Sequence, residues 1–209
     1  MATSITSEKL VIVEGKDEVE VLQTLLPIIG IYNLQVIACG GNIKFKQEFP
    51  ALIKTPGFID VTSYGIMQDA DDNVKSTFDR ILYTLKKTEQ PAPKTPGEFC
   101  TENGVKVGIY LFPGKNRQGV LEDMFLETLE ETPVKEMADV YIGNLQERCP
   151  HTSEKGRFGI SPRVAKSKVL SVLAATTDPC NKLGIAAKQG YWDFSHPAMQ
   201  DLINFLKAI

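Results

Sequence analysis

The sequence lacks a membrane span, a secretion signal and a recognisable zinc site. No apolar run approaches the roughly 20 residues of a membrane-spanning helix, so we expect no membrane partner. The N-terminus has no basic segment followed by an apolar one, and we therefore expect a cytoplasmic protein. The four cysteines are far apart, without a C-x-x-C pair, and only two histidines accompany them. Zinc sites are usually built from closely spaced pairs of such residues, which argues against one here.

The composition is that of an ordinary globular protein with little net charge. The chain has 209 residues, of which 43% are hydrophobic and 23% are charged, which suits one domain or one domain with an appendage. The net charge of -3 does not by itself indicate a nucleic-acid-binding protein. Its distribution is uneven, because acidic residues gather in 120–139 and basic residues in 147–168. The basic segment is either a phosphate-binding face or a solvated surface.

Residues 10–26 have the pattern of a strand that runs directly into a helix. Residues 10–13 are apolar, as in a strand buried on both faces, and apolar residues then recur at helical spacing. Glu14 lies between the two elements, at the carboxyl end of the strand, the edge of an α/β sheet where ligands bind. Glu18 follows one helical turn later, so both carboxylates can point the same way. The alternative role of Glu18 is that of an ordinary first-turn acid, which the helix dipole favours.

A second acidic stretch has the same layout. The strand-like run 64–68 is followed by Asp69 and Asp71, which would point to one side of an extended chain end before a helical pattern begins. If the two strands are parallel neighbours, Glu14, Asp69 and Asp71 converge at one edge of the sheet. Clustered carboxylates there favour a hard cation, Mg²⁺ or Mn²⁺. The plainer alternative for the aspartates is capping of the helix, for which Asp72 is the better placed.

A third acidic pair, Glu122 and Asp123, follows the polar loop 113–119 and opens another predicted helix. These two residues either complete the metal site from a third element or are ordinary first-turn acids. The candidates for holding a substrate phosphate are three cations: Lys44, Lys115 and Arg117. The alternative is that these three cations are ordinary surface charges.

The order of the elements predicts an α/β fold. We expect a Rossmann-like, mostly parallel sheet flanked by helices, a β-hairpin inserted at Asn103-Gly104, and extra C-terminal helices. Residues 1–132 should form the α/β domain, and 133–209 a helical extension packed on the same domain. An aromatic cluster near the C-terminus consists of Tyr191, Trp192 and Phe194. It either stacks on bases or docks the last helix on the core.

The motifs resemble the Toprim domain, the metal-dependent module shared by topoisomerases, bacterial primases and several nucleases. The resemblance rests on E-G-x-x-E at 14–18 after a first strand and D-x-D at 69–71 after a later strand. The E-G-K-D-E form is closest to the overcoming-lysogenisation-defect (OLD) branch. Residues 36–44 of this chain resemble the second strand and the glycine turn of that branch. The segment 190–197 is similar to the C-terminal signature of a small, stand-alone, uncharacterised bacterial family related to it.

The resemblance implies a Toprim-like domain over 1–132 and a site of the OLD type. The implied catalytic residues are Glu14, Glu18, Asp69 and Asp71, and the implied metal ligands are Glu14, Asp69, Asp71, Glu122 and Asp123. Glu14 or Glu18 would accept the proton of the attacking water. Topoisomerases and primases of this superfamily need a further catalytic region, for which this chain has no room.

We therefore expect a metal-dependent phosphodiester hydrolase, a nuclease that acts on DNA or RNA. The alternative is a non-catalytic module that binds a nucleotide or a partner protein in a defence or stress system. OLD-like Toprim domains are often paired with an ATPase, and the P-loop pattern G-x-x-x-x-G-K-[ST] is absent from the chain. Any ATPase partner would thus be a separate protein. A third hypothesis is a phosphatase of a small phosphorylated molecule, and the sequence leaves homo-oligomerisation open.

Overall fold

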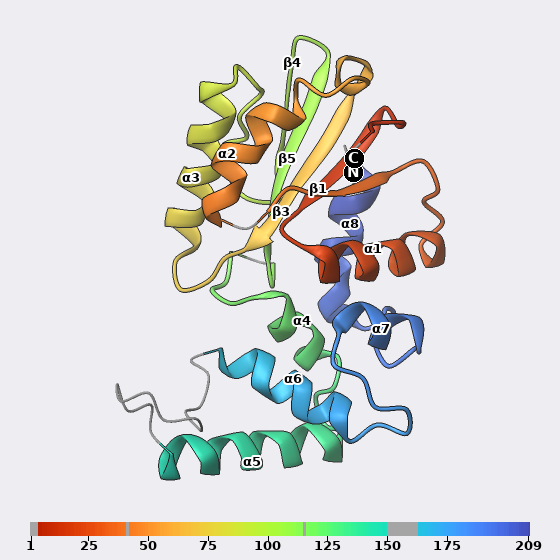
Figure 1. Cartoon of the computed structure of the whole chain (residues 1–209), viewed down its shortest axis with the longest axis vertical. Coiled ribbons are helices and arrows are strands. Elements are labelled where there is room, and N and C mark those ends of the chain that lie inside the picture. Colours follow the sequence, from red (N-terminus) through yellow and green to blue (C-terminus); the bar gives the residue numbers. More distant parts are fainter. Residues whose placement is uncertain (1–3, 41, 115, 150–162) are drawn as a thin grey trace.

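The computed structural model describes residues 4–40, 42–114, 116–149 and 163–209 and contains one five-stranded sheet of order β2-β1-β3-β5-β4 (Figure 1). The strands are β1 (Lys9–Val13), β2 (Gln35–Ala38), β3 (Ser63–Asp69), β4 (Phe99–Glu102) and β5 (Val105–Phe112). The first three and β5 run parallel, and β4 pairs antiparallel with β5. The predicted α/β fold with a mostly parallel sheet is confirmed.

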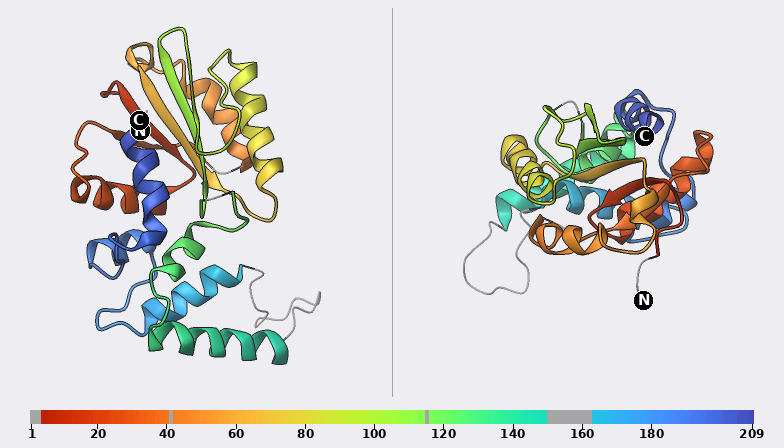
Figure 2. Two further views of the ribbon diagram at one scale, coloured as in Figure 1. Left: turned by 180° about the vertical axis from the view of Figure 1, so that it is seen from behind. Right: turned by 90° about the horizontal axis from the view of Figure 1, so that it is seen from above.

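Helices cover both faces of the sheet, as the two views in Figure 2 show. The flanking helices are α1 (Lys16–Ile28), α2 (Asn42–Leu52), α3 (Val74–Lys87) and α8 (Gln200–Ala208). Side chains of β1 alternate between two cores: Leu10 and Ile12 pack with residues of α2 and α3, whereas Val11 and Val13 pack with residues of α1 and α8. Burial on both faces is the reason why β1 is continuously apolar.

The inserted hairpin is built as predicted. Asn103 and Gly104 join β4 to β5 with positive φ angles of 51° and 80°. Two consecutive residues with positive φ are what a type I′ turn requires, and asparagine followed by glycine meets that requirement at low cost. The register places Phe99 opposite Gly108, where a Cβ atom would lie 2.5 Å from the phenyl ring. The absence of a side chain at Gly108 therefore makes room for Phe99.

The remaining helices lie at the carboxyl end of the sheet and beside α1 (Figure 1). They are α4 (Leu121–Glu127), α5 (Pro133–Arg148), α6 (Val164–Ala174) and α7 (Leu183–Lys188). Two single 3-10 turns complete the list: η1 (Phe58–Asp60) precedes β3 at the amino end of the sheet, and η2 (Pro197–Met199) precedes α8. Trp192 is buried, stacks on Phe125 with ring centroids 4.5 Å apart, and donates a 3.1 Å hydrogen bond from Nε1 to the Leu183 carbonyl. Trp192 thus docks the C-terminal segment on the core.

Local details differ from the sequence-based expectations. Helix α1 includes Pro27 and α2 includes Pro50, although each proline lacks the N–H that would bond to the carbonyl four residues earlier. Asn73 rather than Asp72 caps α3, since its side chain accepts a 2.8 Å hydrogen bond from the Ser76 N–H. Helix α7 has no counterpart among the predicted elements. Across the described ranges, no helix is both long and apolar enough to span a membrane.

Candidate active site

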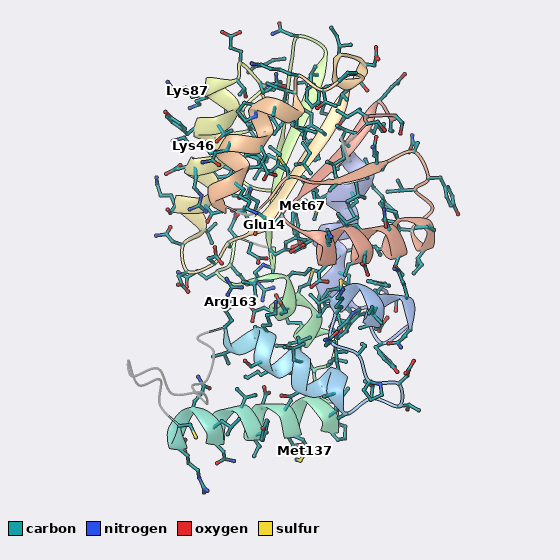
Figure 3. All side chains as sticks on the ribbon, in the orientation of Figure 1. Glu14, Lys46, Met67, Lys87, Met137 and Arg163 are labelled. Carbon is teal, nitrogen blue, oxygen red and sulfur yellow. The ribbon has the colours of Figure 1, made fainter. Side chains whose placement is uncertain are left out.

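Glu14 and Asp69 lie at the ends of two neighbouring parallel strands. Ile12 of β1 pairs with Ile66 of β3, so the residues that follow reach the same edge of the sheet. Glu14 comes directly after β1, and Asp69 is the last residue of β3. The parallel pairing of these strands, which is the condition for the predicted convergence, is observed, and it brings the first two acidic motifs together. Figure 3 marks Glu14 at this carboxyl edge.

An open cleft of about 1310 Å³ lies at this edge and is bordered by the starts of α1, α4, α6 and α7. Its acidic lining residues come from all three motifs: Glu14, Asp17, Glu18, Asp69, Asp71, Asp72, Glu122 and Asp123. Its basic lining residues are Lys16, Lys44, Arg163, Lys166 and Lys182. Every residue predicted to be catalytic or to bind metal therefore lines one cavity, together with cations that come partly from the C-terminal helices.

Glu14 is the acid whose environment is most unusual. Its Oε1 atom is buried and has no hydrogen-bond partner among the described residues. The pKa of Glu14 is raised to about 7, chiefly by burial and then by the negative charges of Glu18 and Asp71, against smaller opposing effects of the Asp69 backbone and Arg80. An acceptor oxygen left unpaired in such a place costs free energy, and a cation among the carboxylates would remove that cost.

Asp69 connects the sheet edge to α4. Its Oδ1 atom accepts a 2.9 Å hydrogen bond from the Leu121 N–H. Burial and the charge of Glu14 raise the pKa of Asp69 well above its usual value, while the bond from Leu121 acts in the opposite direction. The negative charge of Glu14 thus disfavours ionisation of the Asp69 carboxyl.

Asp71 is positioned by its backbone. Its φ is 50°, a left-handed conformation that aspartate tolerates better than most residues. Asp71 and Gly119 form an isolated antiparallel bridge, and Thr77 Oγ1 donates a 3.3 Å hydrogen bond to the Ala70 carbonyl beside it. The D-x-D turn is thereby fixed between the start of α4 and the first turns of α3.

Glu18 bends back toward the start of its own helix. A Cβ atom on Gly15 would lie 3.0 Å from Glu18 Oε2, so a side chain at residue 15 would crowd this carboxylate. Burial raises the pKa of Glu18, whereas the backbone N–H groups of Glu18 and Gly15 lower it. The E-G-x-x-E spacing thus directs the second acid toward the cleft.

The third motif divides into two roles. Asp123 Oδ2 accepts a 2.9 Å hydrogen bond from the Val120 N–H, which is the ordinary contribution of an acid to a helix start. Burial raises the pKa of Glu122, and the nearby charge of Lys166 opposes this effect. Glu122 is therefore the member of the pair whose charge meets a cation from α6.

The chemistry of the candidate ligands suits a hard divalent cation, but their present arrangement does not yet form a binding site. All the candidate ligands are carboxylates, and one buried oxygen is unpaired, which suits Mg²⁺ or Mn²⁺. Nevertheless, among the residues that the structure describes, no three acidic, histidine or cysteine side chains are already grouped as metal ligands. The fit therefore requires the carboxylates to rotate toward one another, and Asp69 must share its bond from Leu121.

The predicted phosphate-binding cations are separated by the structure. Lys44 lines the cleft, and Lys115 lies outside the described residues. Arg117 is not among the lining residues. Its guanidinium forms a two-pronged ion pair with Glu127, at 2.6 Å and 3.2 Å.

Sequence reasoning missed other cations near the carboxylates. Lys166 and Arg163 line the cleft and belong to the basic segment, so the clustering of charge was their signal. Lys182 also lines the cleft, without any local pattern that marks it. Arg80 has the appearance of a solvated residue of α3, yet its charge acts on Glu14. Arg163, Lys166 and Lys182 come from the C-terminal part of the chain, whose placement the sequence does not specify.

Comparison with known families places most of the chain in one of them. The model of a family described as "Protein of unknown function (DUF3226)" matches residues 8–209. No curated protein and no solved structure matches the chain.

Proposed function

The chain belongs to the DUF3226 family, and since the description of that family names no activity, we propose from the geometry of the cleft that the protein is a metal-dependent phosphodiester hydrolase acting on nucleic acid. The observation that carries the proposal is the unpaired, buried Oε1 atom of Glu14 beside Asp69. Two carboxylates that repel each other destabilise the fold, and such arrangements are typical of functional sites. A divalent cation is the simplest ligand that would relieve the repulsion.

Each side chain would have a defined role. Glu14, Asp69 and Asp71 would hold Mg²⁺ or Mn²⁺, with Glu122 and Asp123 as further carboxylates at the same cavity. The bound ion would supply Lewis-acid chemistry, which lowers the pKa of water and offsets charge on the phosphoryl oxygens. Glu18 would accept a proton at its carboxylate, since burial already raises its pKa.

The cations of the cleft support a phosphate-bearing substrate. Lys44, Lys166 and Lys182 line the same cavity as the acids, and the first turns of the longer helices α1 and α6 border it. Helix starts attract phosphate because their N–H groups are unpaired and the dipole is positive there. Carboxylates for an ion and cations for a phosphate in one cavity are the two requirements of phosphodiester hydrolysis.

The Toprim resemblance supports the same assignment. The residues that carry it, Glu14, Glu18, Asp69 and Asp71, are those that line the cleft. Their order along the chain and their positions after β1 and β3 agree with the pattern that the resemblance implies. We therefore propose a Toprim-like nuclease, of the OLD-like branch, as the specific form of this hydrolase.

A cleavage assay tests the proposal. Purified protein should cleave at least one member of a panel of single- and double-stranded DNA and RNA in Mg²⁺ or Mn²⁺, and EDTA should stop the reaction. Asp69→Asn should abolish cleavage, whereas Asp79→Asn, which changes an exposed aspartate of α3, should not. A panel left intact in both metals would overturn the nuclease proposal.

The arrangement of the carboxylates also favours a second candidate, a non-catalytic module. The described carboxylates are not already grouped as metal ligands, as expected if the cleft binds a nucleotide or a partner protein such as a separate ATPase. Titration calorimetry with nucleoside triphosphates, alone and with Mg²⁺, separates the candidates. Tight binding without turnover favours the module, and metal-dependent cleavage favours the hydrolase.

A further inference from the structure

A second cavity lies on the α8 side of the sheet, apart from the acidic cleft. Its volume is about 350 Å³, and it shares no lining residue with the cleft. The residues that matter here are Phe99, Tyr110, Gly114, Asp201, Asn204 and Phe205. Three of them recur at helical spacing on α8, so one face of that helix forms a wall. We call this cavity the α8 pocket.

Tyr110 contributes a polar atom that nothing in the described chain satisfies. The side chain is 4% exposed, and its hydroxyl has no hydrogen-bond partner among the described residues. Such a buried hydroxyl costs roughly 1–3 kcal/mol when it is left unpaired. Native proteins retain few such groups, and a ligand that completes the bond is one explanation for this one.

Gly114 packs closely against this hydroxyl. A Cβ atom built on Gly114 would lie 2.5 Å from Tyr110 Oη and 3.8 Å from Asp201 Cβ. The φ of Gly114 is 97°, which also disfavours any other residue. The phenol, the glycine and the aspartate therefore meet at one place, and the lack of a side chain at residue 114 lets the hydroxyl lie beside the aspartate.

The charge and the rings of the pocket define what it can bind. Asp201 is the one charged residue among the described residues of its lining. Phe205 stacks on Phe99 with ring centroids 4.9 Å apart and lies 5.3 Å from the ring of Tyr110, so the wall is aromatic. Two cations lie near the pocket, and both are engaged: Arg117 is paired with Glu127, and Lys106 donates to the Ala208 carbonyl with its ammonium 4.7 Å from the Phe99 ring centroid. A carboxylate beside aromatic rings attracts a cation and repels an anion.

We propose that the α8 pocket binds a small organic cation, with an ammonium or amidinium group at Asp201 and Tyr110 Oη and a compact apolar body against Phe99 and Phe205. The N–H groups of the ligand would donate to the carboxylate and to the phenol oxygen. A volume of about 350 Å³ is near the lower limit of ligand pockets. The ligand is therefore of fragment size.

Calorimetry on the full chain with three probes of similar shape tests this proposal. Benzylamine carries the cation, benzyl alcohol is its neutral counterpart and benzoate is an anion. Benzylamine should bind saturably, and the other two at least about tenfold more weakly, since a charge-assisted hydrogen bond is stronger than a neutral one. Equal binding of benzylamine and benzyl alcohol, or no binding of benzylamine, would overturn the proposal.

Variants localise the site. Asp201→Asn should weaken benzylamine binding about tenfold, whereas Asp79→Asn on the opposite face of the sheet should leave it unchanged. Tyr110→Phe should also weaken binding, yet the free variant should melt at the same or a higher temperature, because it loses an unpaired buried hydroxyl. Unaltered binding in both Asp201→Asn and Tyr110→Phe would show that benzylamine binds elsewhere.

Discussion

Asp71 and Gly119 exchange both of their backbone hydrogen bonds, each 2.9 Å long, across the loops that follow β3 and β5. Asp71 has a φ of 50° and Gly119 a φ of 132°. These bonds join the D-x-D turn to the segment that starts α4, which carries Glu122 and Asp123. The second and third acidic motifs are therefore positioned by one backbone contact, and a change at Gly119 should disturb both.

Gly119→Ala should destabilise the protein and weaken any metal-dependent activity. The new Cβ atom would lie 2.6 Å from Asp123 Oδ2, in a backbone conformation that alanine rarely adopts. Together these effects should cost about 2–4 kcal/mol of the free energy of unfolding, measured by urea denaturation. Gly97→Ala is the matched control, since Gly97 has a φ of 86° but open space around its Cβ position. An equal loss in both variants would mean that the contact with Asp123 contributes nothing.

Asp69→Asn should stabilise the protein in EDTA while abolishing cleavage. Burial and Glu14 raise the pKa of Asp69 well above its usual value, so a neutral amide of the same shape removes repulsion and keeps the acceptor for the Leu121 N–H. We expect the free energy of unfolding to rise by on the order of 1 kcal/mol. Thermal melts in EDTA measure this, with exposed Asp79→Asn as the control. A variant that is less stable than the parent would contradict the proposed repulsion.

The stability of the metal-free protein should fall as the pH rises from about 4.5 toward 7. Burial raises the pKa of Glu14 from 4.5 to about 7, so the folded state binds the proton more tightly than the unfolded state does. The stabilisation that comes from protonated Glu14 is complete at pH values below the pKa of this group in the unfolded state. It is lost as the pH rises through the pKa of the group in the folded state. The change should be on the order of 1–3 kcal/mol.

Glu14→Gln isolates this effect. Urea denaturation between pH 5 and 8 should give a flatter profile for the variant than for the parent. Mg²⁺ should stabilise the parent most at the alkaline end, where Glu14 is ionised and can act as a ligand. A parent profile with the same slope as that of Glu14→Gln would contradict the raised pKa.

The sequence predicts the sheet and the acidic edge because their signals are local. The apolar run before Glu14 and the Asn103-Gly104 turn each specify their element within a few residues. The prediction that Glu14 and Asp69 lie close together needs one further assumption, that β1 and β3 pair in parallel. That pairing is observed.

The rest depends on contacts between distant segments. Helix α7 is short, and its place is set by close packing on α1, where a Cβ atom on Gly184 would lie 2.2 Å from Glu20 Cβ. The partner of Arg117 is Glu127, on another element. Neither contact has a periodicity or a motif that marks it, so the position of Lys182 at the cleft and the absence of Arg117 from its lining could not be predicted from the sequence.

Arg80 is the missed residue with the clearest expected effect. Its Nη2 group donates a 2.9 Å hydrogen bond to Thr77 Oγ1, while its Nε atom is buried without a partner among the described residues. The positive charge of Arg80 lowers the pKa of Glu14, against the larger effect of burial. Arg80→Gln removes the charge, so the pKa of Glu14 should rise and the acid limb of any pH–activity profile should move to higher pH. NMR titration of the Glu14 carboxyl carbon measures the shift directly, and Lys75→Gln on the exposed face of α3 is the control.

Because Thr77 also supports the D-x-D turn through Ala70, a second variant, Arg80→Lys, separates the effect of charge from that of geometry. Arg80→Lys keeps the positive charge, so it should retain most of the effect of Arg80 on the pKa of Glu14. If Arg80→Gln leaves the Glu14 titration unchanged, the guanidinium does not act on this carboxylate in solution.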